Sequence, residues 1–289
     1  MTDCSPLATD DGFFTIFALD HRDALMVELQ NEAGATDPDP DDLQAFKRDM
    51  LEAFGGLAEL PSAVMLEPEY SLPDLVPSVP DGVGITCALE AQGYFSAPDA
   101  GNSLMEGWHP GRVTEVGAHA AKLLLLYRHD RGEFTASQER LAAEVVAGAA
   151  QAGVPALIEP VPVDVVDADD RREVILAAAE RLNGLGPMIL KLPFPGPGAC
   201  AELTKRCGDR PWALLSWGVP FDEFADQLAE AAAGGCSGFA VGRALWREAV
   251  APSTRAEFNQ SSLPERFAAL AALARGGKPW WEAGVGSDG

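Results

Sequence analysis

Met188-Ile189-Leu190-Lys191-Leu192-Pro193 is a short apolar run with one lysine near its carboxyl end. Glycine and proline residues on both sides bound the run, which is too short for a lone helix and is predicted to be a buried strand. An ammonium group is rarely buried among apolar side chains, because removing it from water has a large free-energy cost unless it finds a partner. Lys191 therefore has either a functional role or a stem that carries its charge to the surface.

A second apolar run, Ala121 to Tyr127, also carries a lysine, Lys122. The chain has only five lysines among its 21 basic side chains, so arginine supplies most of its cations. Two of these five lysines lie in predicted strands. We interpret both as functional groups near the carboxyl ends of their strands.

Composition limits the classes of partner. The formal net charge of -23 opposes binding to nucleic acid and to anionic membrane surfaces, and neither is an expected partner. The hydrophobic fraction of 47% is ample for a large core. No apolar run approaches the roughly 20 residues of a membrane span, and the acidic start of the chain lacks a basic leader. A cytoplasmic location is expected.

The five cysteines are odd in number and scattered, without the spacing of a zinc site. This pattern is typical of reduced thiols in a cytosolic protein.

Eight runs are predicted to be strands, and most are followed by a segment with helical spacing. The strands are residues 13–19, 63–66, 83–89, 121–127, 155–158, 188–193, 212–215 and 238–241. The helices are residues 43–60, 113–119, 135–152, 169–182, 199–207, 221–233, 244–250 and 262–275. This alternation predicts a single (β/α)8 barrel over residues 1–289. A doubly wound open sheet is the alternative, but no G-x-G-x-x-G follows the first strand.

Three segments fall outside this alternation. Residues 1–12 are expected to form a loose tail, and residues 262–289 a terminal helix and tail that cover the barrel. An acidic loop at 36–42 precedes and caps the helix of 43–60. The long Gly- and Pro-bearing segment 91–111 is predicted to be a loop and is a candidate lid.

Active sites of such barrels lie at the carboxyl ends of the strands. Asp20, Lys122, Glu159 and Lys191 end strands one, four, five and six, so their side chains are expected to converge on one pocket. Two neighbouring amines disfavour a second positive charge, which leaves one amine nucleophilic toward a carbonyl. Glu159 is expected either to exchange protons with the reacting groups or to neutralise Lys122; both roles are compatible.

The last two strands run into Ser216-Trp217-Gly218 and Gly242-Arg243. Backbone N–H groups of these glycines and the Arg243 guanidinium would suit a phosphate, which barrels often hold at strands seven and eight. Alternatively, the glycines only turn the chain. Arg22 either organises Asp20 together with His21 or contacts a substrate anion.

Taken together, these residues resemble a known family. The motifs are Ala18-Leu19-Asp20-His21-Arg22, Glu67-Pro68-Glu69-Tyr70-Ser71-Leu72-Pro73, Lys122-Leu123-Leu124-Leu125-Leu126-Tyr127, Ile158-Glu159-Pro160-Val161, Leu190-Lys191, Leu215-Ser216-Trp217-Gly218-Val219 and Gly238-Phe239-Ala240-Val241-Gly242-Arg243-Ala244-Leu245-Trp246. Over residues 13 to 250 they are similar to the class I aldolases of the tagatose-1,6-bisphosphate and sulfofructose-phosphate aldolase family.

The resemblance implies metal-independent cleavage of a phosphorylated ketose by an enzyme without cofactors that commonly forms homo-oligomers. It implies that Lys191 forms the Schiff base, that Glu159 and Lys122 assist proton transfer, and that Asp20 binds substrate hydroxyls. The phosphate would be held by Ser216, Trp217, Gly218, Gly242 and Arg243.

The chain departs from the family pattern at two positions. His21 stands where the family usually has glutamine, and Pro193 stands where it has an acidic residue two positions after the reactive lysine. The runs around Glu159 and Ser216 favour the sulfofructose-phosphate branch, although aldolases of inositol breakdown have similar runs. Other interpretations are a non-catalytic phosphosugar sensor and an isomerase that uses Glu159 as its base.

Overall fold

The structure, a computed structural model, describes residues 3–33 and 39–284, so parts of the two expected tails and residues 36–38 of the expected acidic loop lie outside it. Eight parallel strands form a closed barrel in chain order, and the predicted (β/α)8 architecture is confirmed. The strands are β1 (Phe14–Ala18), β2 (Ala63–Leu66), β3 (Gly84–Ala88), β4 (Ala120–Tyr127), β5 (Ala156–Pro162), β6 (Ile189–Leu192), β7 (Trp212–Leu215) and β8 (Gly238–Val241).

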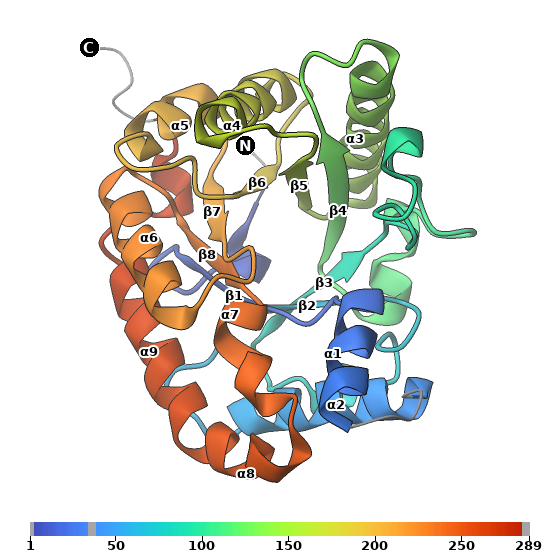
Figure 1. Cartoon of the computed structure of the whole chain (residues 1–289), viewed down its shortest axis with the longest axis vertical. Helices are drawn as coiled ribbons and strands as arrows, with labels where there is room; N and C mark the ends of the chain where they lie inside the picture. Colours follow the sequence, from blue (N-terminus) through green and yellow to red (C-terminus); the bar gives the residue numbers. More distant parts are fainter. Residues whose placement is uncertain (1–2, 34–38, 285–289) are drawn as a thin grey trace.

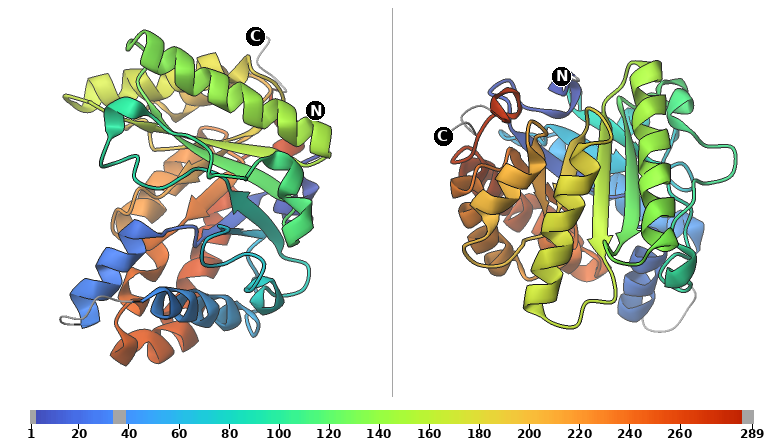
Figure 2. Two further views of the ribbon diagram at one scale, coloured as in Figure 1. Left: turned by 90° about the vertical axis from the view of Figure 1, so that its right-hand side faces the viewer. Right: turned by 90° about the horizontal axis from the view of Figure 1, so that it is seen from above.

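Helices surround the strands as an outer ring (Figure 1). They are α1 (Asp23–Ala33), α2 (Pro40–Phe54), α3 (Glu133–Ala152), α4 (Ala168–Asn183), α5 (Cys200–Cys207), α6 (Phe221–Ala233), α7 (Arg243–Trp246), α8 (Pro252–Gln260) and α9 (Ser262–Ala274). Figure 2 shows the longest of them, α3, lying alongside β4 and β5. Within the described residues, no helix is both long and apolar enough to cross a membrane.

Several helices differ from those predicted in where they begin or end, or in whether they form. The helix expected over 43–60 is α2, which begins earlier because Asp39 caps it: the Asp39 carboxylate accepts from the backbone N–H groups of Asp41 and Asp42. The segment 113–119, predicted to be helical, contains only the short 3-10 turn Thr114–Val116, and a second 3-10 turn, Pro110–Arg112, precedes it. Helices α1 and α8 were not predicted; both are polar and weakly amphipathic.

Closure of the barrel depends on one glycine. Strand β8 pairs with β1 so that Gly238 lies opposite Phe14. A Cβ added at Gly238 would lie 2.0 Å from the Phe14 carbonyl oxygen, and its φ of +134° disfavours other residues. Only glycine lets the two strands approach to this register.

The start of the chain is not the loose tail that we expected. Leu7 is fully buried, Cys4 is 3% exposed, and residues Ser5–Leu7 form a 3-10 turn. The Ser62 hydroxyl donates to the Leu7 carbonyl oxygen at 2.8 Å and anchors the turn at the amino end of the barrel. Apolar side chains of this segment join the inner core, and their burial outweighs the entropy of a free terminus.

The other expectations for the periphery hold. Helix α9 covers the barrel through Phe267, whose ring packs edge-on against Phe54 and Phe239. All five cysteines are buried.

Candidate active site

The inward-facing side chains at the carboxyl ends of the strands line one pocket of about 460 Å³. Asp20 follows β1 and Lys191 is the last residue but one of β6, close to the predicted positions. Lys122 and Glu159 do not end their strands as predicted but lie within β4 and β5, because these two strands continue past the pocket to Tyr127 and Pro162. These four expected residues therefore converge, although more than 100 positions separate Asp20 from Lys122 in the chain. The closed, parallel topology brings them together because all eight strands end on the same face.

Lys122 is the electrostatic centre of the pocket. Its Nζ lies 2.7 Å from Asp20 Oδ2, 2.7 Å from Glu90 Oε1 and 3.0 Å from Glu159 Oε2, and the residue is 1% exposed. Burial by itself would lower the pKa of Lys122, but the charges of the three carboxylates outweigh burial and raise it well above its ordinary value. Lys122 is therefore protonated at neutral pH.

Lys191 has a different environment. Its Nζ lies 3.0 Å from Glu159 Oε1 and 3.5 Å from the Met65 sulfur, and the residue is 5% exposed. Glu159 thus lies between the two lysines, with one carboxylate oxygen toward each. A carboxylate at this distance is placed to exchange a proton with the Lys191 amine.

Asp20 and His21 respond to these charges in different ways. Burial would raise the pKa of Asp20, but the charges of Lys122 and Lys191 outweigh it and hold the pKa well below its ordinary value. Burial lowers the pKa of His21 to about 3 against the opposing effect of Asp20, so the imidazole is neutral at pH 7. The ring packs edge-on against Trp246, with centroids 5.2 Å apart.

Arg22 is held by protein groups rather than presented to a ligand. Its Nη2 donates to the Glu90 carbonyl oxygen at 2.8 Å. With the Gln92 amide oxygen turned toward the guanidinium, that oxygen accepts from Nη2 at 2.7 Å and from Nε at 3.1 Å. Glu69 lies 3.7 Å from Nη1, and the Arg22 side chain is 1% exposed. These contacts go to Glu90, Gln92 and Glu69 rather than to Asp20, and they oppose a role for Arg22 in binding a substrate anion.

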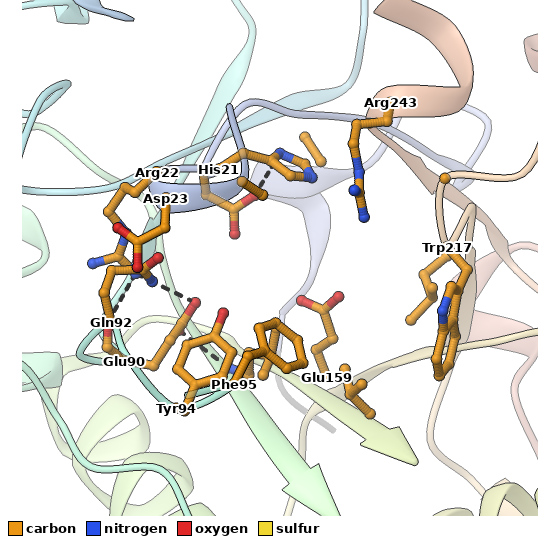
Figure 3. Close-up of a pocket in the computed structure, with 18 of the residues that line it drawn as sticks. His21, Arg22, Asp23, Glu90, Gln92, Tyr94, Phe95, Glu159, Trp217 and Arg243 are labelled. Atoms are coloured by element: carbon orange, nitrogen blue, oxygen red, sulfur yellow. Dashed lines mark hydrogen bonds and ion pairs between the residues drawn. The ribbon is translucent and has the colours of Figure 1, made fainter. Parts of the chain in front are cut away.

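The residues expected at a phosphate all line this pocket. Two of them, Trp217 and Arg243, lie across it from Arg22 and Gln92 (Figure 3). Ser216, Trp217 and Gly218 follow β7, and Gly242 and Arg243 follow β8. A Cβ at Gly242 would lie 2.7 Å from His21 Cε1, so this position requires glycine for close approach. Arg243 Nη1 is 3.6 Å from Glu28 Oε1, and a third of its side chain is exposed.

The segment 91–111 supplies pocket residues that sequence reasoning missed. Gln92, Tyr94 and Phe95 line the wall that faces Arg243 and Trp217 (Figure 3). No periodic pattern marks them in the sequence. Glu90 was missed as well, although it ends its strand as Asp20 does and the same rule identifies it.

Both ends of this segment are fixed to the barrel. Glu90 pairs with Leu104 in an antiparallel bridge, and Asn102 Oδ1 accepts from the Leu126 N–H at 2.6 Å. The lid function remains a prediction. Across residues 3–33 and 39–284, no three or more His, Cys, Asp or Glu side chains are grouped to hold a metal ion.

A family model described as DeoC/LacD family aldolase matches residues 14–248 of the chain. The chain belongs to this family. The DeoC/LacD aldolases are carbon–carbon lyases, and the expectation of an aldolase is confirmed.

Curated relatives in the DeoC/LacD group carry more specific names. The chain is 28% identical to a protein of Enterococcus faecalis named tagatose 1,6-diphosphate aldolase 2, over 86% of this chain and 84% of that one. It is also 28% identical to a Streptococcus agalactiae protein named tagatose 1,6-diphosphate aldolase, over 84% of each.

Solved structures share the fold of this DeoC/LacD aldolase. An archaeal fructose 1,6-bisphosphate aldolase superposes with a TM-score of 0.66 at 19% identity, covering 94% of this chain and 97% of that one. Another archaeal structure, titled as having its catalytic lysine covalently bound to the carbinolamine intermediate of the substrate, superposes with a TM-score of 0.62 at 18% identity. This superposition covers 93% of this chain and 96% of the archaeal chain.

Proposed function

We propose that the chain is a Schiff-base aldolase that cleaves a phosphorylated ketose to an aldehyde and dihydroxyacetone phosphate or a related product. The observation that carries this proposal is the position of Lys191, which ends a barrel strand inside the pocket with Glu159 3.0 Å away. The neighbouring buried amine, Lys122, is occupied by three carboxylates. Lys191 is therefore the amine that meets the substrate.

The first chemical step joins Lys191 to the ketone. Glu159 accepts a proton from Lys191 Nζ, and the free amine attacks the carbonyl carbon to form a carbinolamine. Glu159 returns a proton to the carbinolamine hydroxyl, which leaves as water, and the iminium remains. Lys122 supports this exchange because its Nζ, 3.0 Å from Glu159 Oε2, holds the carboxylate in position between proton transfers.

The iminium then accepts the electron pair of the breaking C–C bond. The hydroxyl on the carbon that becomes the aldehyde loses its proton to a carboxylate of the pocket, and the aldehyde departs. The enamine is protonated on carbon, and water hydrolyses the resulting iminium to regenerate the amine. We assign Asp20 to binding substrate hydroxyls, because its low pKa keeps it an acceptor.

The phosphate is assigned to the wall formed after β7 and β8. Arg243 supplies the positive charge, while Ser216 and the backbone N–H groups of Gly218 and Gly242 supply further donors. Trp217 closes this side, with the Arg171 guanidinium 4.6 Å above its ring. Because β6 neighbours β7 in the barrel, a phosphate here lies close to the carbon that condenses with Lys191.

Trapping tests the proposal directly. The protein is incubated with dihydroxyacetone phosphate, reduced with borohydride and digested, and the peptides are measured by mass spectrometry. We expect the reduced adduct on Lys191, with Lys122 and the exposed Lys205 unmodified as internal controls. An unmodified Lys191, or cleavage activity abolished by a chelator, contradicts the proposal.

The sugar is identified by a cleavage panel. It contains fructose and tagatose as 1-phosphates and as 1,6-bisphosphates, 6-deoxy-6-sulfofructose 1-phosphate, and the deoxy-keto-phosphogluconate of inositol-type catabolism. The ratio of kcat/KM values across the panel ranks the substrates. Trapping on Lys191 is expected with every ketose phosphate that the pocket admits.

A further inference from the structure

The positive charges of the pocket are few, and all of them lie in the part of the chain that the structure describes. Segments 1–2, 34–38 and 285–289 contain no lysine or arginine, so all 21 of these residues are within the described part. Four of them line the pocket: Arg22, Lys122, Lys191 and Arg243.

Three of these four cations already have partners or a chemical role. Lys122 is surrounded by carboxylates, and Lys191 condenses with the ketone in the proposed function. Arg22 donates to Glu90 and Gln92, lies 3.7 Å from a Glu69 oxygen, and has a side chain that is only 1% exposed. Arg243 is the remaining pocket cation: its one ion-pair contact among the described residues is Glu28 at 3.6 Å, and a third of its side chain is exposed to a ligand.

The wall opposite Arg243 is acidic and aromatic. Asp23, Tyr94 and Phe95 lie there, across the pocket from Arg243 and Trp217 (Figure 3). Glu90 also lines the pocket, and its Oε1 lies 2.7 Å from Lys122 Nζ. Burial and the charge of Glu90 raise the pKa of the Tyr94 phenol, so this group is a neutral hydrogen-bond donor. Phe95 is 65% exposed and gives the mouth an apolar surface.

We propose that the substrate carries a single anionic group, the phosphate beside its ketone, and that its far end is an uncharged hydroxylated chain. This inference rests on the proposed function and narrows it. A second phosphate or a sulfonate at the far end would meet the carboxylate of Asp23 without a cation to balance it, which opposes binding. The aldehyde released from that end therefore carries no phosphate.

The synthetic direction tests this inference with one donor held fixed. Dihydroxyacetone phosphate is supplied with either glyceraldehyde or glyceraldehyde 3-phosphate, two acceptors that differ only in the phosphate. We expect kcat/KM to be at least about tenfold higher for unphosphorylated glyceraldehyde, which corresponds to about 1.4 kcal/mol. An equal or higher value for the phosphorylated acceptor overturns the inference and leaves the proposed function standing. No condensation with either acceptor, together with no trapping on Lys191, overturns both.

A second test adds a positive charge to the wall formed by Asp23, Tyr94 and Phe95. Phe95→Lys places a cation opposite Arg243 at an exposed position, so we expect the preference to move toward the phosphorylated acceptor by about fivefold or more. Val166→Lys is the matched control, because Val166 is 84% exposed and does not line the pocket. An unchanged ratio in the Phe95→Lys protein contradicts the inference that charge at this wall selects the substrate.

Discussion

The two ends of the barrel interior are built from the same strands but have opposite chemistry. At the amino end, inward side chains such as Ala120, Leu157 and Ile189 pack into a closed apolar core. Two residues further along each strand, the inward positions are Lys122, Glu159 and Lys191. Because alternate residues of a strand face the same side, one step of the pleat changes apolar packing into a charged pocket.

Within a single strand, the apolar residues at the amino end contribute to stability and the charged residues toward the carboxyl end form the site. Apolar residues at the amino end contribute to folding through burial, and the turn at Ser5–Leu7 extends that core beyond the strands. Charged residues at the carboxyl end are tolerated because Lys122 and its carboxylates satisfy one another. Substitutions at the amino end should therefore change stability alone, whereas substitutions among the charged residues can change activity, stability or both.

The largest effect is expected from Lys191→Met. Without the amine no iminium forms, so kcat for ketose phosphate cleavage should fall by at least about a thousandfold. Glu159 keeps its contact with Lys122, so the free energy of unfolding should stay within about 1 kcal/mol of wild type. Lys205→Met, which changes an exposed lysine on α5, is the control and should retain full activity. Substantial activity in the Lys191→Met protein would rule out the Schiff-base role.

The next largest effect is expected from Lys122→Met, and it falls on stability. Three buried carboxylates lose their shared cation, so the free energy of unfolding at pH 7 should decrease by about 3 to 5 kcal/mol, measured by urea denaturation. A loss below about 1 kcal/mol would show that the carboxylates do not depend on Lys122.

The same charges make the stability of the wild-type protein depend on pH. The folded-state pKa of Lys122 is raised, so its contribution to stability is fully present below the unfolded value of about 10.4 and is lost as pH rises through the folded value. The folded-state pKa of Asp20 is lowered, so its contribution is present above about 3.9 and is lost as pH falls toward the folded value.

His21→Gln tests the electrostatics of the pocket with a smaller effect. The unfolded chain protonates His21 below about pH 6.5, whereas the folded protein resists protonation down to about pH 3, so this residue destabilises the fold as pH falls between these values. Between pH 7 and pH 4.5 the free energy of unfolding should therefore fall by about 2 to 3 kcal/mol less in the variant than in wild type. Parallel pH profiles for the two proteins would contradict this assignment.

The smallest effect is expected at the amino end. Ile189→Val removes one methylene group from the inner core and should lower the free energy of unfolding by about 0.5 to 1.5 kcal/mol. Cleavage activity should be unchanged, although Ile189 is only two residues from Lys191 on β6. A selective loss of activity without a loss of stability would show that the two ends are coupled.

Local patterns in the sequence determined much of this protein. Short apolar runs bounded by turn residues predicted all eight strands, and lysines among leucines indicated the site. The sequence did not reveal α1 and α8, because their polar residues give weak periodicity. It also did not predict the buried turn at Ser5–Leu7, because the few apolar residues of this segment are buried only against the assembled amino end of the barrel.

The tertiary structure decided how the charges are shared. The sequence placed Lys122 and Lys191 at strand ends, but only the closed barrel brings Asp20, Glu90 and Glu159 onto Lys122 and leaves Lys191 beside a single carboxylate oxygen. The partners of Arg22 and the aromatic wall of Tyr94 and Phe95 were likewise settled by folding. Strand identity is a local property of burial and periodicity, whereas ionisation depends on distances between residues far apart in the chain.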